Sequence, residues 1–418
     1  MDTREFDIVL YGATGFVGAL TARYLSQQAG TARVALAARS RSRLESVRGR
    51  LDESAADWQL IEVDARDASG LDALAARTRV IATTVGPFSV HGKEVARACA
   101  AAGTHYADLT GEVLFVRWTM DTLAGRAAET GARLVHACGY DSVPSDLAVH
   151  LLARRAAEDG MGTLGDTVLA VRSAKGGFSG GTIDSARQQA ILVREEPETR
   201  RVLADPYALS PRRAEEPRSV SRRTGGLAGL LHKVMPVDRD PASGRWNGPF
   251  AMAGFNTRVV RLSNTLTDWS YGREFRYREV VDFGKGPLSP VLAAGMAIGL
   301  TGGLAGLSWA PSRAVLDRLL PKPGEGPSDE QLAAGRFLME TRTTTTTGAR
   351  YLARVGAPYD PGYTGTAVML GESALALALD GDRLPQRAGV LTPATAIGDV
   401  LVERLRAQGF TLEVERLG

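Results

Sequence analysis

Asp7-Ile-Val-Leu-Tyr-Gly-Ala-Thr-Gly-Phe-Val-Gly18 decides the fold of this chain. Three apolar residues lead into Gly12, two further glycines follow at three-residue intervals, and a helical pattern begins after Gly18. This order is typical of a strand, a tight turn and a helix whose free N–H groups and dipole attract a phosphate. A plain strand-to-helix turn is the alternative. We predict a dinucleotide site and place in it Gly12, Ala13, Thr14, Gly15, Phe16 and Val17.

The composition is that of a folded protein with more than one core. A chain of 418 residues exceeds what one core usually holds, so two domains are expected. The net charge of +3, from 50 basic and 47 acidic residues, gives no reason to expect a nucleic-acid partner. Cys99 and Cys138 form neither a disulfide framework nor a metal-ligand spacing. We therefore expect a cytoplasmic protein without a metal site, and no signal peptide at the charged N-terminus.

The second predicted strand, 33–38, ends in a segment that selects the cofactor. An acid at this position would bind the ribose 2′-hydroxyl of NAD, whereas arginine accommodates the 2′-phosphate of NADP. The chain has no acid there and continues Arg39-Ser40-Arg41-Ser42-Arg43. Arg39, Ser40 and Arg43 therefore predict NADP(H), against the alternative of a solvated helix start.

Two later strands add residues to the same edge. The third strand, 60–64, ends at Asp64, which either lies near the adenine or caps the following helix, 71–77. The fourth strand, 79–85, runs into a Gly-Pro turn where open α/β sheets place ligands, so we expect Val85, Gly86 and Pro87 beside the ribose and nicotinamide. His91 could be an acid, although a lone histidine in a loop is more often incidental.

Polar groups also follow the strands at 105–108 and 131–138. Because the carboxyl ends of parallel strands share one edge, these segments supply the site candidates. Ser145 and Asp146 are expected to cap the helix 147–157 instead. The candidates are Tyr106, Asp108, Glu112, Tyr140 and Asp141.

After Asp146 the pattern changes to that of a second domain. We expect the chain to be α/β, with an N-terminal Rossmann parallel sheet in 1–146 and a second α+β domain containing an antiparallel sheet in 147–389. Its predicted strands are 166–172, 255–263, 275–281, 340–347 and 349–355, with a last strand at 412–417, and its helices are 183–194 and 364–379. The glycine loop 176–182 either touches a ligand or is a linker, and the Arg/Pro-rich stretch 195–244 is expected to be a partly disordered surface excursion.

The stretch 288–310 has no charged residue and is long enough to cross a bilayer. Pro290 and several glycines interrupt it, and predicted strands lie on both sides, which argues against a spanning helix. We expect a hydrophobic hairpin, buried or at the surface, that touches lipid or a long acyl chain.

Taken in order, these segments resemble the saccharopine dehydrogenase-like oxidoreductase family, and within it an enoyl reductase subfamily. Val17 and Tyr140 stand where the family pattern has threonine and phenylalanine, so the resemblance does not support a role for Tyr140. The blocks that carry the resemblance are Tyr11–Gly15, Thr83–Pro87, Tyr106–Glu112, Cys138–Ser142, Pro144–Asp146, Lys322–Gly324 and Thr343–Arg350.

The resemblance implies an NADPH-dependent enoyl reductase of complex cell-envelope lipid synthesis. Its substrate would be an α,β-unsaturated acyl thioester on the carrier domain of a polyketide synthase that lacks its own enoyl reductase. Tyr106 and Tyr140 are the first candidates for proton donor, Asp141 is next, and water is an alternative. A helix at about 390–408 would return to the Rossmann domain. We also consider a homodimer and a peripheral position at the inner face of the cell membrane.

Two other functions stay open. The chain could reduce an imine or another small molecule, as founding members of the family do, with Arg258, Arg261 and Arg276 clamping substrate carboxylates. It could also be a non-enzymatic, lipid-associated NADP-binding protein that needs no proton donor.

Overall fold

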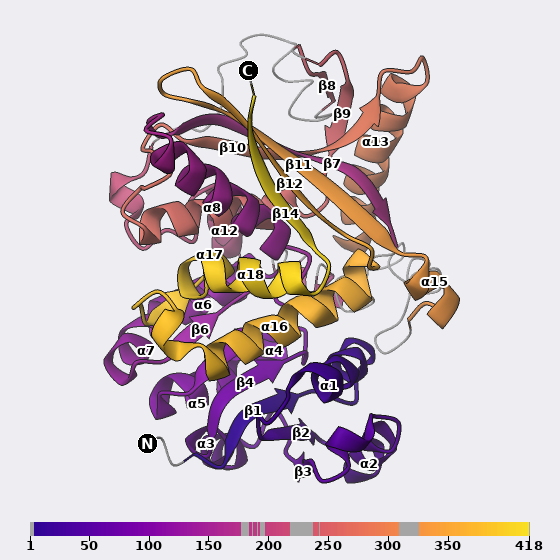
Figure 1. Ribbon diagram of the computed structural model, residues 1–418, viewed down its shortest axis with the longest axis vertical. Coiled ribbons are helices and arrows are strands. Elements are labelled where there is room, and N and C mark those ends of the chain that lie inside the picture. Colours follow the sequence, from indigo (N-terminus) through magenta and orange to yellow (C-terminus); the bar gives the residue numbers. More distant parts are fainter. Residues whose placement is uncertain are drawn as a thin grey trace.

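Two seven-stranded sheets lie one above the other in the computed structural model (Figure 1). The model describes residues 4–176, 184–185, 187–189, 191–192, 197–217, 237–241, 243–308 and 326–417. The first sheet is parallel, in the order β3-β2-β1-β4-β5-β6-β13. Its strands are β1 (Phe6–Tyr11), β2 (Val34–Ala38), β3 (Gln59–Glu62), β4 (Thr78–Thr83), β5 (His105–Asp108), β6 (Arg133–Val135) and β13 (Gly389–Leu391).

Helices cover both faces of this sheet, which explains why β1 is buried along its whole length. The order of β1 to β6 is that of a Rossmann fold, and all the carboxyl ends meet at the edge facing the second sheet. The covering helices from the N-terminal part of the chain are α1 (Phe16–Gln28), α2 (Arg41–Arg48), α3 (Ala68–Ala76), α4 (Phe88–His91), α5 (Lys93–Ala102), α6 (Val113–Thr122) and α7 (Ala124–Thr130).

The second sheet has the order β14-β12-β11-β7-β10-β9-β8 and is mixed. The predicted antiparallel sheet is present in five of the six neighbouring pairs, and the pairing of β7 with β10 departs from it because these two strands are parallel. The predicted hairpin is present and pairs Thr341 with Ala353. The strands are β7 (Leu164–Lys175), β8 (Asp238–Arg239), β9 (Trp246–Pro249), β10 (Arg276–Gly284), β11 (Arg336–Thr345), β12 (Arg350–Ala357) and β14 (Thr411–Leu417).

The predicted strand 255–263 is wrong, because these residues lie within helix α12 (Ala253–Leu266). Phe255, Val259 and Leu262 are buried at helical spacing, and the intervening residues gave the segment a false appearance of alternation. The other helices of this region are α8 (Val143–Glu158), α10 (Pro197–Ala204), α13 (Ser289–Ser308) and α15 (Asp329–Ala333).

The hydrophobic stretch forms one continuous helix, α13, and the expected hairpin is wrong over the described part. Glycines inside it did not reverse the chain, since glycine weakens a helix by only about 1 kcal/mol. No helix in the described ranges has both the length and the apolar character needed to cross a membrane.

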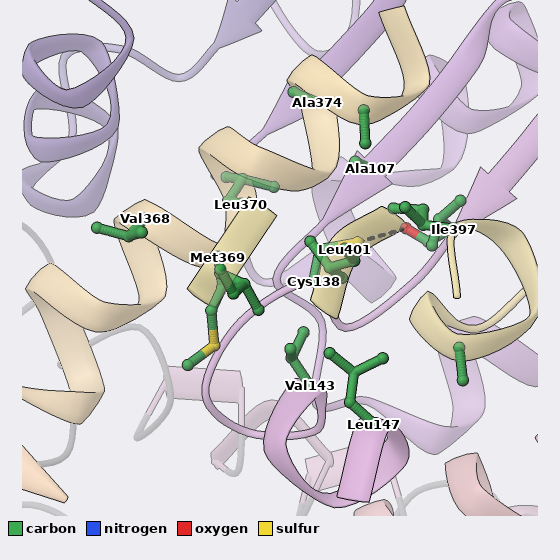
Figure 2. Close-up of a cluster of buried hydrophobic side chains, with 14 of the residues drawn as sticks. Ala107, Cys138, Val143, Leu147, Val368, Met369, Leu370, Ala374, Ile397 and Leu401 are labelled. Atoms are coloured by element: carbon green, nitrogen blue, oxygen red, sulfur yellow. Dashed lines mark hydrogen bonds between the residues drawn. The ribbon is translucent and has the colours of Figure 1, made fainter. Parts of the chain in front are cut away.

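The C-terminal part returns to the first sheet. α16 (Thr366–Leu379) packs on α1 and β4, and α17 (Pro393–Ala396) and α18 (Asp399–Ala407) follow β13. Figure 2 shows apolar side chains of α8, α16 and α18 around Cys138, so these helices share one core with the Rossmann sheet. Asp146 does not cap α8: it lies inside the first turn, where it accepts a hydrogen bond from Ala394 N at 2.8 Å. Ser145 likewise lies inside the helix.

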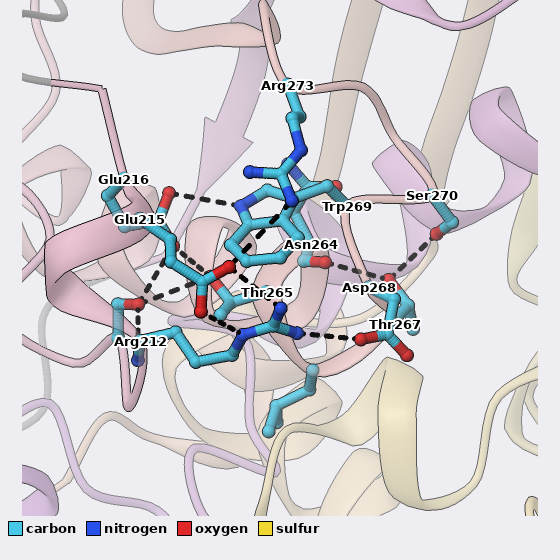
Figure 3. Close-up of polar contacts among 12 residues, drawn as sticks. Arg212, Glu215, Glu216, Asn264, Thr265, Thr267, Asp268, Trp269, Ser270 and Arg273 are labelled. Carbon is cyan, nitrogen blue, oxygen red and sulfur yellow. Dashed lines mark hydrogen bonds and ion pairs between the residues drawn. The ribbon is translucent and has the colours of Figure 1, made fainter.

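Part of the predicted excursion 195–244 is fastened to the second domain around Trp269 (Figure 3). Arg212 and Arg273 lie over the indole ring at 4.0 and 3.8 Å from its centroid, and the indole N–H donates to Glu216 at 3.3 Å. Trp269 has a left-handed backbone with φ of 56°, which is unfavourable for a bulky residue. These contacts hold the strained turn after α12. The described part of 195–244 contains α10, a short helical turn at 213–215 and β8. Residues 218–236 lie outside the described residues, as do most of the glycine loop 176–182 and 322–324.

Candidate functional site

A cavity of about 1430 Å³ lies between the two sheets. One end is formed by the carboxyl ends of β1, β2 and β4, and the other by β7, β10, α12 and α13. Sites for drug-sized ligands usually measure about 300–1,000 Å³. The cavity is therefore large enough for a dinucleotide together with a second molecule, at the edge where α/β sheets bind ligands.

The glycine turn forms the first end of this cavity. Gly12 has φ of +91°, a backbone conformation that favours glycine. A Cβ at Gly18 would lie 2.1 Å from Gly12 O, so the missing side chain of Gly18 lets α1 pack directly against the turn. A Cβ at Gly15 would meet only Gly12 O, at 3.4 Å, which leaves its other side open. Gly15 is the N-cap of α1, without a side-chain cap or an acidic residue in the first turn.

The open turn and uncapped helix fit the pyrophosphate of a dinucleotide, which would accept hydrogen bonds from these N–H groups. Five of the six predicted residues line the cavity, and Ala13 is buried beneath them. The lining residues of the turn are Gly12, Thr14, Gly15, Phe16 and Val17.

Three exposed arginines line the cavity after β2 and β3. Arg39 and Arg43 were predicted, and Arg66 was not, although it follows Asp64 by only two residues. None of them forms an ion pair with a carboxylate in the described parts of the chain. Such unneutralised guanidinium groups fit a 2′-phosphate. Ser40 does not line the cavity, and its hydroxyl lies 3.3 Å from Ser42 Oγ.

We predict that the double variant Arg39→Ala/Arg43→Ala loses NADPH affinity by about 10- to 100-fold. A charge-assisted hydrogen bond contributes about 1.5–3 kcal/mol to binding, and solvent exposure of these arginines reduces that contribution. NADH lacks the 2′-phosphate, so its affinity should change less than threefold. Titration calorimetry with both nucleotides measures the ratio. An equal loss for both would show that these arginines do not bind the 2′-phosphate.

Asp64 also lines the cavity and does not cap the following helix, while its contact with the adenine stays a prediction. The N-cap of α3 is Asp67, which accepts a hydrogen bond from Gly70 N at 2.9 Å. Asp64 instead accepts from Arg66 N at 2.9 Å and turns the chain at the cavity rim.

Val85, Gly86 and Pro87 line the cavity, as does His91. Thr84 Oγ1 donates to Gly12 O at 3.1 Å, which ties this turn to the glycine turn. Buried Glu112 accepts hydrogen bonds from Phe88 N at 2.7 Å and Ser89 N at 2.9 Å. Glu112 is therefore a positioning residue: it fixes the backbone that follows the Gly-Pro turn.

Tyr140 and Asp141 both line the cavity, in the loop between β6 and α8. The Tyr140 hydroxyl is shielded from solvent and has no hydrogen-bond partner in the described structure, and burial raises its pKa far above the usual value. Asp141 is half-buried, and burial raises the pKa of its carboxyl to about 6. No described residue donates a hydrogen bond to that carboxyl or pairs with it.

Tyr106 does not line the cavity and must be withdrawn as a catalytic candidate. Its side chain is fully buried in the core of the first domain, where it contacts His136 edge-on. Asp108 is also buried and accepts from Ala137 N at 2.9 Å, and its carboxylate lies 2.7 Å from His136 Nδ1. Ala137 has φ of 62° and lines the cavity, so Asp108 holds a strained backbone at the rim.

The far end of the cavity is mostly apolar. Arg172 from β7 also lines it, but its charge is engaged by Glu340 at 2.9 Å and by buried Asp282. The apolar lining comes from α12, α13 and the strands beside them, and includes Phe250, Met252, Phe255, Val281, Met296 and Leu300. Met296 and Leu300 belong to the stretch 288–310 that was expected to touch lipid or an acyl chain, whereas the other four residues belong to no motif and could not be found from the sequence.

The three arginines considered as a carboxylate clamp do not converge. Arg258 lines the cavity, but its guanidinium donates to the backbone carbonyls of Leu203, Asp205 and Gly254. Arg261 is buried against Pro206 O and Tyr277 O, and Arg276 forms an exposed ion pair with Asp166. This arrangement offers no paired cations for a dicarboxylic amino acid.

Comparison with known proteins agrees with this geometry. The saccharopine dehydrogenase NADP-binding domain matches residues 8–135. A protein of Mycobacterium tuberculosis, provisionally named a trans-acting enoyl reductase, is 51% identical over 99% of this chain and 98% of its own length. The trans-acting enoyl reductase of Mycobacterium bovis is 47% identical over 99% of both chains. The chain belongs to the trans-acting enoyl reductase family.

Within this family the chain is an NADP-dependent oxidoreductase with a Rossmann domain. Saccharopine dehydrogenase from Saccharomyces cerevisiae has the same fold over 98% of this chain and 99% of its own, with a TM-score of 0.55 and 13% sequence identity. The homospermidine synthase of Legionella pneumophila, solved with NAD, gives a TM-score of 0.50 at 11% identity, over 100% of this chain and 92% of its own. These two likenesses concern the fold alone.

Proposed function

We propose that the protein reduces the carbon–carbon double bond of an α,β-unsaturated acyl thioester carried by a polyketide synthase, with NADPH as reductant. The observation that carries this proposal is one continuous cavity that joins the glycine turn to an apolar end, with the unpartnered carboxyl of Asp141 in its wall. The relatives at 47–51% identity are named trans-acting enoyl reductases, which supports the same reaction.

The chemistry divides between the cofactor and this chain. NADPH, when bound at the glycine turn and the arginines, supplies a hydride to the β-carbon of the double bond. The protein must then protonate the α-carbon, and we assign this proton to Asp141, because burial keeps part of its carboxyl protonated near neutral pH. Tyr140 is the weaker candidate, since its hydroxyl is shielded from solvent and strongly favours its neutral form.

The second substrate must bring both an acyl chain and its carrier. Met252, Phe255, Met296 and Leu300 offer the acyl chain an apolar surface that excludes water from the double bond. The family name describes enzymes that act in trans, so we propose that the thioester enters on the carrier domain of a separate synthase. A homodimer stays a prediction.

The experiment is isotopic. The purified protein is incubated with a 2-enoyl pantetheine thioester and NADPH that carries deuterium at both C4 positions, and in a separate reaction with unlabelled NADPH in deuterated water. We expect one deuterium at the β-carbon in the first case and one at the α-carbon in the second, measured by mass spectrometry and NMR of the product. NADPH oxidation without deuterium in the acyl chain, or reduction of an imine but not of the enoyl thioester, would contradict the proposal.

A further inference from the structure

Helix α13 presents the most apolar exposed surface of the described structure. Seven large apolar side chains are exposed in that part of the chain, and five of them lie between residues 288 and 298. A single exposed apolar side chain is ordinary, whereas a contiguous patch marks an interaction surface. The five side chains are 39% to 69% exposed and are Leu288, Val291, Leu292, Met296 and Ile298.

The helix is attached to the protein by a narrow stripe of small residues. Ser289, Ala293 and Ala297 are buried at four-residue intervals, and α13 packs mainly on β9. A Cβ at Gly248 of β9 would lie 3.3 Å from Ala293 O, so the approach is close. No residue from 286 to 308 is charged, whereas a surface helix normally turns a polar face outward. In Figure 1 this helix stands at the outer edge of the second domain.

The composition of the helix favours lipid over a protein partner. Protein interfaces are enriched in aromatic residues, arginine and methionine, and of these α13 contains a single methionine, Met296. Exposed Lys285 precedes the helix, and Arg245 lies beside the same turn, near Gly284. The acid paired with Arg245 is Asp282, whose side chain is fully buried. In the sequence Trp309 follows, a residue type enriched at membrane interfaces.

We propose that α13 inserts its exposed apolar face into the surface of an anionic lipid bilayer, with Lys285 and Arg245 at the level of the headgroups. An apolar face beside basic residues is the usual combination for helices that lie in a membrane surface.

Met296 and Leu300 of the same helix line the cavity. Together with the proposed function, on which this step rests, the position of α13 lets a long acyl chain enter the apolar end of the cavity from the bilayer.

Vesicle flotation tests this proposal with the full-length protein. The vesicles contain phosphatidylcholine alone, or phosphatidylcholine and phosphatidylglycerol in equal parts. We expect the wild-type protein to float with the anionic vesicles, and the double variant Val291→Glu/Ile298→Glu to lose partitioning by about tenfold or more. Both side chains are exposed and neither lines the cavity, so the fold should be kept. Leu379→Glu, at an exposed apolar residue of α16, is the matched control and should float like the wild type.

Three results would overturn the proposal. The wild-type protein could fail to float with anionic vesicles, or the double variant could float as well as the wild type. Light scattering could also show a dimer that the double variant converts to a monomer, in which case a second copy covers α13. Reduction of a short, soluble enoyl thioester should be equal in the wild type and the double variant. If neither reduces it while the wild type still floats, the proposed function fails and the membrane contact stands.

Discussion

Replacing Asp141 with asparagine should lower kcat for a 2-enoyl thioester by about 10²- to 10⁴-fold, the usual contribution of a general acid. Asparagine has nearly the same shape but cannot release a proton, so the α-carbon would depend on water. The dissociation constant of NADPH should change by less than about threefold, because Asp141 belongs to the loop before α8 and not to the glycine turn or to the segments that carry the arginines. Stopped-flow turnover and nucleotide titration measure the two quantities separately.

The dependence on pH follows from the same carboxyl. Burial raises its pKa to about 6, and a general acid must be protonated, so kcat should be greatest below pH 6. Above that pH the protonated fraction of Asp141 falls, and kcat should fall with it, approaching a tenfold decrease per pH unit. The Asp141→Asn variant should lack this decline. A wild-type profile that rises with pH would contradict the assignment.

Tyr140→Phe is the matched control, since it removes a neighbouring hydroxyl that has no hydrogen-bond partner in the described structure. We expect its kcat to stay within about threefold of the wild type, because the ring keeps its edge contact with Phe337 at 4.9 Å between centroids. A large loss in Tyr140→Phe together with an active Asp141→Asn would transfer the role of proton donor to the tyrosine.

The features that were predicted correctly have local causes. The first strand, the glycine turn and α1 follow from twelve consecutive residues, and the β11–β12 hairpin follows from β-branched threonines next to a single glycine. The parallel pairing of β7 with β10 depends on a crossover through α12, which local patterns do not contain. Residues 255–263 were misassigned because four apolar positions in nine residues fit both periods.

In the candidate site, too, some features have local causes in the sequence and others depend on the tertiary fold. The cofactor end follows from the order of glycines and arginines along the chain, whereas the distinction between Tyr106 and Tyr140 does not. Both tyrosines lie near the end of a predicted strand, but Tyr106 is inside β5, between neighbours on both sides, and Tyr140 is in a loop that reaches the cavity. Burial of a side chain depends on the elements that cover it, here α5 and α6, and the way these helices pack on β5 is a property of the tertiary fold that no local sequence pattern contains.

Gly18→Ala should destabilise the protein by about 1–3 kcal/mol or more and abolish most NADPH binding. The added Cβ would lie 2.1 Å from Gly12 O and 2.9 Å from Gly12 C, which are backbone atoms that cannot rotate away. To relieve the overlap, α1 must move away from the glycine turn. That movement displaces the N–H groups at Gly15, so stability and cofactor affinity should fall together.

Gly125→Ala provides the control for adding a methyl group at a helical glycine. Gly125 is exposed in α7, and a Cβ there would meet no atom within 4 Å. Alanine is a better helix former by about 1 kcal/mol, so this variant should be as stable as the wild type or more stable, with unchanged NADPH affinity. Urea unfolding and nucleotide titration of both variants measure the contrast. If Gly18→Ala unfolds at the wild-type urea concentration and still binds NADPH, the close packing of α1 on the turn is not what forms the phosphate site.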